Sequence, residues 1–303
     1  MKISFVKWML WIPLAVLLIG VLVTLPAHST ALAAAVPHSG TPPGQHFFNY
    51  LPAIMRPGSV AIIIDHTTVD ISRIPANYNN LAKAQLRLSY GHTSHGSQLI
   101  SGADYWYTQN PLFAFNTDGS IQANTLSIAD STPGGDLGNP DFTNWESETR
   151  AYLNDAGSSR NAVMWSWCGQ VSWASEENIQ IYLNLMNGLE RDYPNVKFIY
   201  MTGHLDGSGV DGNLYQRNNQ IRAYARANNK ILFDVADIES YDPAGNYYPD
   251  SDDSCPWCVT WCSAHPDQCV DLPDCAHSLN GFNCKLKGQG FWWLLARLAG
   301  WNG

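Results

Sequence analysis

Strand-type and helix-type hydrophobic patterns alternate along most of the chain. Short runs of β-branched and aromatic residues predict strands over residues 59–65, 86–90, 161–167, 196–201 and 230–235. Apolar residues with helical spacing predict helices over residues 75–84, 97–107, 142–153, 176–193 and 213–228. Residues 108–140 are predicted to be loop-rich, and a helix is expected over residues 288–301. Alternating strands and helices predict an α/β fold, a three-layer α/β/α sandwich around a mostly parallel sheet.

The N-terminal region has the pattern of a secretory signal peptide. Lys2 and Lys7 precede an apolar run, and small residues follow at positions 31–35. We therefore expect a signal peptide over residues 1–35, with an uncleaved membrane anchor as the alternative. Residues 36–58, rich in Pro, Gly and Ser, are expected to be a linker. The α/β domain is expected over residues 59–303, outside the cytoplasm in either case.

Composition and charge narrow the range of partners. The chain has 303 residues, 45% of them hydrophobic, and a formal net charge of −9. An acidic chain without a basic cluster is not expected to bind nucleic acid. Contact with a membrane is expected only if the N-terminal segment is retained.

Six of the seven cysteines lie in the segment 250–284. Disulfides are the expected state of such a segment outside the cytoplasm. A zinc site is the alternative, formed by Cys255, Cys258, Cys262 and His265. The seventh, Cys168, follows a predicted strand. It is expected either to pack as a small apolar residue or to act as a reactive thiol, an alternative nucleophile.

Polar residues collect where the predicted strands end. In LRLSYGHTSHGSQL, Ser94 stands between a strand and a helix, and Cys168-Gly169-Gln170 and His204 follow two later strands. The carboxyl ends of parallel strands share one edge of a sheet, where α/β proteins bind ligands. A hydroxyl at a helix start is sited for nucleophilic attack, because the free N–H groups there stabilise an oxyanion. The alternative is that Ser94 only caps the helix.

A base for this serine is found near the other end of the chain. Asp274 and His277 are three residues apart, so the carboxylate can hold one nitrogen of the imidazole while the other faces the serine. The sequence therefore predicts Ser94, His277 and Asp274 as a catalytic set.

These motifs together resemble the SGNH (GDSL-like) hydrolase superfamily over about residues 60–301. The resemblance implies a flavodoxin-like fold, with Ser94 as nucleophile, His277 as base and Asp274 as its orienting carboxylate. It implies an oxyanion hole built from Gly138, Gly169 and Gln170. The chain departs from the family pattern in two places: Ser94 stands in HTSHG rather than Gly-Asp-Ser, and Gln170 takes the place of the usual asparagine.

The expected function is that of a secreted esterase, with an acetylated extracellular glycan as one candidate substrate. His95, His204 and Asp206 are expected to contact substrate. No cofactor or metal is expected, although His92, His95 and His204 form an alternative metal set. A non-catalytic glycan-binding domain on the same fold is the alternative function.

Overall fold

A central sheet of seven parallel strands organises the described part of the protein. The computed structural model describes residues 60–155 and 159–303, so the expected signal peptide and linker lie outside the described residues. The strand order is β1-β7-β6-β5-β2-β4-β3, and every pairing is parallel. The strands are β1 (Ile62–Ile64), β2 (Arg87–Gly91), β3 (Phe115–Asn116), β4 (Leu126–Asp130), β5 (Ala162–Trp165), β6 (Lys197–Met201) and β7 (Ile231–Phe233).

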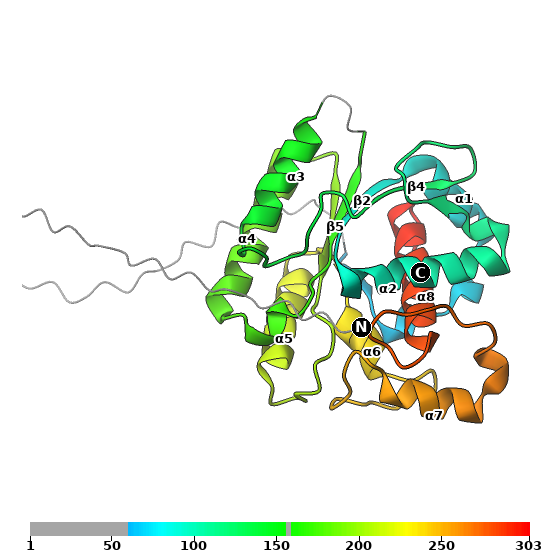
Figure 1. The fold of residues 1–303 in the computed structure, drawn as a ribbon. Coiled ribbons are helices and arrows are strands. Elements are labelled where there is room, and N and C mark those ends of the chain that lie inside the picture. The colour runs from blue at the N-terminus through cyan, green and yellow to red at the C-terminus, as the bar shows by residue number, and fades with distance from the viewer. Residues whose placement is uncertain (1–59, 156–158) are drawn as a thin grey trace, which may run out of the picture. The chain divides into compact units, whose positions relative to one another are not determined.

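Helices cover both faces of this sheet and complete a three-layer α/β/α sandwich (Figure 1). One layer holds α3 (Asn144–Asn154), α4 (Glu176–Asp192) and α5 (Asn213–Ala227). The other holds α1 (Ala76–Gln85), α2 (Ser94–Gln109) and α8 (Phe282–Leu298). Two shorter helices, α6 (Val235–Ser240) and α7 (Pro256–Ala264), precede α8 in the chain. The expected fold class is confirmed.

The largest difference from the sequence prediction is strand β4. It lies inside the sheet between β2 and β3, in a region expected to be loops. Leu126 and Ile128 are buried, but the strand is only five residues long and has turn-forming residues on both sides. Such a short apolar pattern does not stand out from a loop. Helix α2 also differs, because it begins at Ser94 rather than at residue 97, with Thr93 as its N-cap.

Two glycines allow α2 and α8 to cross at close range. A Cβ atom on Gly102 would lie 1.9 Å from the carbonyl oxygen of Cys284, and one on Gly288 would lie 2.3 Å from the backbone of Gly102. Only glycine allows the two backbones to approach so closely. This crossing matters for function, because α2 begins with Ser94 and His95 while α8 follows the loop that carries His277.

The cysteine-rich segment is held by three disulfides. They join Cys255 to Cys258, Cys262 to Cys269, and Cys275 to Cys284. The alternative of a zinc site is therefore wrong, since its three cysteines are all in disulfides. Cys168 is the free cysteine of the described residues. Three disulfides are typical of a protein in an oxidising compartment.

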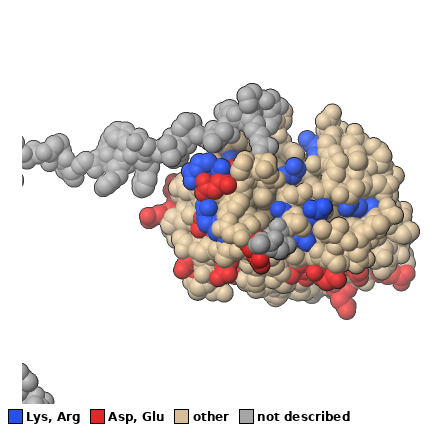
Figure 2. All heavy atoms as spheres, turned by 90° about the horizontal axis from the view of Figure 1, so that it is seen from above, with Lys and Arg blue, Asp and Glu red and all other residues tan. Residues whose placement is uncertain are grey.

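The surface is of mixed charge on the face that Figure 2 shows. Basic side chains are scattered across the middle of that face, and acidic side chains lie along one edge. Among residues 60–155 and 159–303, no helix is both long and apolar enough to cross a bilayer.

The close crossing of α2 and α8 predicts a specific sensitivity to volume. Gly102→Ala should lower the free energy of unfolding by about 1–3 kcal/mol, because the added methyl group forces the two helix backbones apart. Gly188→Ala is the matched control, since Gly188 lies inside α4 with no atom closer than 3.7 Å to an added Cβ. That variant should be neutral or more stable by up to about 1 kcal/mol. Urea unfolding measures both, and equal effects would contradict the proposed contact.

Candidate active site

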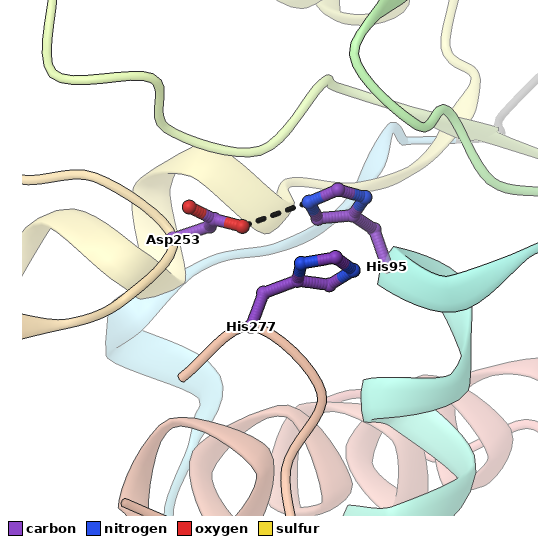
Figure 3. A group of neighbouring side chains, drawn as sticks. All are labelled: His95, Asp253 and His277. Carbon is purple, nitrogen blue, oxygen red and sulfur yellow. Dashed lines mark hydrogen bonds and ion pairs between the residues drawn. The ribbon is translucent and has the colours of Figure 1, made fainter. Parts of the chain in front are cut away.

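His95 is the centre of a cluster of polar side chains at the carboxyl edge of the sheet. It is the second residue of α2, directly after β2. Cys168 comes from the segment after β5, and His204 from the loop after β6. Asp253 precedes α7 and His277 precedes α8, so the C-terminal segment supplies two members. Figure 3 shows how three of these side chains meet, with Asp253 bonded to His95 and His277 beside the same ring.

Three imidazole rings stack face to face in this cluster. The ring centroid of His95 is 3.8 Å from that of His204 and 3.9 Å from that of His277, with 3° between the planes in each pair. Both faces of the His95 ring are therefore covered, and the ring cannot rotate without displacing a neighbour. The edge of the ring stays available for hydrogen bonds.

Both ring nitrogens of His95 have partners. Nε2 lies 2.8 Å from Oδ2 of Asp253, and Nδ1 lies 3.0 Å from Sγ of Cys168. A carboxylate only accepts hydrogen bonds, so Nε2 carries the proton and donates it to Asp253 when the ring is neutral. Nδ1 is then the acceptor for the thiol proton. A thiol, an imidazole and a carboxylate in this order form the arrangement that activates a cysteine nucleophile.

Charge in the cluster favours an ionised Asp253 and a neutral His277. Burial alone would raise the pKa of Asp253, but the hydrogen bond from His95 and the nearby imidazoles hold it below its ordinary value. His277 is exposed overall, but the partial desolvation of its ring lowers its pKa, and charge on His95 would lower it further. A neutral imidazole at this position is able to accept a proton.

The loops that carry the outer two histidines are anchored to one buried network. Lys287, on α8, is 2% exposed and pairs with Oε1 of Glu239, on α6, at 2.5 Å. Oε2 of Glu239 accepts the backbone N–H of Leu205 at 2.6 Å, next to His204. Lys287 also donates to Gln98 of α2, whose side-chain amide donates to the carbonyl oxygen of Ala276, next to His277.

The residues predicted as a catalytic serine set are not joined to one another. Ser94 is exposed at the start of α2, and its hydroxyl makes no hydrogen bond within the described residues. Asp274 is also exposed and has no hydrogen bond or ion pair in that part of the chain. His277 does reach the site, where it contacts His95. The serine mechanism stays a prediction, since no hydrogen bond, ion pair or ring contact joins its three members within the described residues.

The predicted oxyanion-hole residues lie together beside Cys168. A Cβ atom on Gly138, whose φ is +80°, would lie 2.9 Å from Cβ of Gln170. The Gln170 amide is already engaged, since its oxygen accepts the Cys168 N–H at 2.8 Å and its nitrogen donates to Asp136 at 3.0 Å. Gly169 has open space around it, with no atom within 4 Å of an added Cβ.

The cluster also offers ligand atoms for a metal ion. One atom each from His95, Asp253 and His277 lie within 4.8 Å of one another. His204 and His92, of the alternative metal set, do not belong to this group. Nε2 of His92 lies 2.8 Å from Asp130 instead. Two imidazoles and one carboxylate are suitable ligands for zinc, so metal content must be measured alongside any activity.

Asp253 is the site residue that the sequence did not indicate. It stands 158 residues after its partner His95, within a run of aspartates and serines typical of a loop. Pairing between two loops places Asp253 beside His95, since the Asp253 N–H donates to the Leu205 carbonyl oxygen at 3.1 Å. Asp206, predicted to contact substrate, lies next to Leu205 in the loop after β6. It accepts hydrogen bonds from Ser208 and lines a separate cavity.

No protein-family model matches the chain, and no curated protein or solved structure matches it either. The resemblance to the SGNH superfamily is therefore a prediction from motifs, and the candidate site depends on its own geometry.

The lowered pKa of His277 predicts how stability responds to acid. The unfolded chain binds this proton near the ordinary value of 6.5, whereas the folded protein binds it only at lower pH. The contribution of His277 is therefore complete well above its ordinary pKa of 6.5 and is lost as the pH falls through that value towards the lower pKa of the folded state. Its NMR titration should have a midpoint below 6.5, and His277→Asn should lose less stability than the parent over this interval. A midpoint at or above 6.5 would contradict the burial argument.

The buried ion pair predicts an asymmetry between single and double substitutions. Lys287→Met leaves the carboxylate of Glu239 buried without its cation, which should cost about 3–5 kcal/mol of stability. Adding Glu239→Gln removes the stranded charge and keeps an oxygen for the Leu205 N–H, so the double variant should recover part of this loss. Urea unfolding of both variants measures the loss of stability and its partial recovery. Equal losses would mean that Glu239 is not charged.

Proposed function

We propose that the protein is a hydrolase that cleaves an ester through a covalent intermediate on Cys168. The observation that carries the proposal is the continuous contact from the Cys168 thiol through His95 to Asp253. A nucleophile in contact with a base, and a base held by a carboxylate, is the structural signature of covalent catalysis. Stacking on both faces of the His95 ring adds the fixed orientation that such a base requires.

The reaction follows from these contacts. Nδ1 of His95 takes the thiol proton while Sγ of Cys168 attacks the ester carbonyl carbon, forming a carbon–sulfur bond. The carbon–oxygen bond then breaks, and His95 returns the proton to the leaving alcohol. Water next attacks the thioester, His95 takes its proton, and the thiol is restored as the acid leaves. Asp253 stabilises the imidazolium that forms twice in this cycle.

The first turn of α2 supplies donors for the negative oxygen that develops. The first N–H groups of an α-helix have no partner within the helix, and their dipoles favour an anion. His95 belongs to this turn, so the base and the donors are carried by one rigid element. Gly169 leaves room beside Cys168 for the acyl group.

A serine mechanism is the second candidate, and one observation favours it. His277 lies against His95 at the start of α2, where Ser94 is the first residue, and its lowered pKa keeps it in the form that accepts a proton. This is the SGNH-type mechanism, in which Ser94 replaces Cys168 as the nucleophile and His277 replaces His95 as the base.

The substrate proposed for either mechanism is an ester outside the cytoplasm, with acetylated glycans among the candidates. Secretion is supported by the three disulfides and by the signal-type N-terminus. A glycan-binding domain without catalysis is the competing proposal, because it needs no reactive thiol.

Hydrolysis of p-nitrophenyl acetate by single variants tests the nucleophile. Cys168→Ala should lower kcat/KM by about a thousandfold or more, because it removes the atom that forms the intermediate. Cys168→Ser is the matched variant, which keeps the volume of the side chain and replaces the thiol with a poorer nucleophile. Thermal unfolding of each variant confirms that the fold is retained.

Three outcomes would contradict this assignment. Loss of activity in Ser94→Ala with activity retained in Cys168→Ala would make serine the nucleophile. Activity that disappears with a chelator and returns with zinc would assign the reaction to a metal bound by His95, Asp253 and His277. A parent protein that hydrolyses no ester would support the binding domain.

A further inference from the structure

A cavity of about 180 Å³ is lined in part by the loop that carries His204. Leu205 and Asp206, which directly follow His204, form part of its wall. Helices α5 and α6 contribute further lining residues, among them Tyr215, Arg222, Arg226 and Asp237. This volume is below the roughly 300 Å³ of a pocket for a drug-sized molecule, and it suits a ligand of about one sugar ring.

A rigid aromatic face borders this cavity. Tyr247 is 43% exposed and stacks on Tyr241 with 4.8 Å between ring centroids. Tyr241 stacks in turn on His66 at 3.7 Å, and His66 is bonded to Asp237 at 2.5 Å. Because Tyr241 is covered on both faces, the exposed ring surface available to a ligand is that of Tyr247. Its orientation is fixed by the two rings behind it, and such a face suits the C–H side of a sugar ring.

The charged groups of the cavity are nearly balanced. Arg222 donates to both oxygens of Asp234, so its charge is neutralised within the protein. Arg226 has no hydrogen bond or ion pair in the described part of the chain, and it offers donors to a ligand. Oδ1 of Asp206 already accepts from Ser208, and Oδ1 of Asp237 from His66, so the second oxygen of each carboxylate is the acceptor left for a ligand. Free donors and free acceptors together suit hydroxyl groups, which do both, better than an anion or a cation.

We infer that this cavity binds a neutral pyranose unit, with Tyr247 as its stacking platform and Asp206 and Arg226 as partners for its hydroxyls. The inference deepens the proposed function, since it assigns the alcohol side of the ester to a sugar, and in that respect it rests on the proposed function. The cavity wall includes Leu205 and Asp206, which directly follow His204 of the catalytic cluster. A sugar in the cavity therefore lies beside the loops that hold the catalytic cluster.

Direct binding tests the inference without relying on catalysis. Calorimetric titration of the secreted protein carrying Cys168→Ala uses the methyl glycosides of glucose, galactose, mannose, xylose and N-acetylglucosamine as probes. At least one should bind, and adding Tyr247→Ala should weaken that binding about tenfold or more. Tyr107→Ala is the matched control, because Tyr107 is 41% exposed on α2 and does not line the cavity. Asp206→Asn should weaken binding as well.

Three results would overturn the inference. They are no binding of any probe at tens of millimolar, equal binding after Tyr247→Ala, or loss of binding only after Trp173→Ala, an exposed ring outside the cavity lining. Ester hydrolysis, measured separately from sugar binding, reports whether the proposed function fails. A protein that binds a sugar through Tyr247 but hydrolyses no ester keeps the cavity assignment and loses the thiol mechanism.

Discussion

The buried ion pair between Lys287 and Glu239 is the interaction on which the site depends. It joins α8 to α6 in a buried position. Glu239 binds the loop that carries His204. Lys287 donates to Gln98, and Gln98 binds the loop that carries His277. The close crossing of α2 and α8 at Gly102 and Gly288 accompanies this arrangement. A charge pair buried this deeply is a poor source of net stability. Its value here lies in placing two loops against one helix.

The placement of these two loops against α2 surrounds the His95 ring at the carboxyl edge of the sheet. Two rings cover its faces, a carboxylate holds one nitrogen, and a thiol contacts the other. Each contact comes from a different segment of the chain. Together they fix the position and the tautomer of the ring, although no short sequence motif contains these residues. The same geometry favours Cys168 over Ser94 as the proposed nucleophile. Cys168 contacts the imidazole of His95, whereas the hydroxyl of Ser94, only one residue from His95, has no partner in the described residues.

The sequence predicted the layers of the fold, because hydrophobic periodicity reports burial directly. It also placed Ser94, Cys168 and His204 at strand ends, where they are found. It did not predict β4, which is too short to have a clear period, or Asp253, which reaches His95 through pairing between two loops. The sequence predicts Asp274 as the partner of His277 only because the two are three residues apart. Sequence spacing on a turn does not fix where two exposed side chains point, and His277 adopts a φ of +65°.

The most direct test of the central claim is to locate the acyl group. The protein is mixed with p-nitrophenyl acetate, quenched in acid within the first turnover, digested and analysed by mass spectrometry. The account predicts an acetyl group on the thiol of Cys168, released by hydroxylamine and absent from the Cys168→Ala variant. An acetyl group on Ser94, or full turnover with no modified residue, would contradict it.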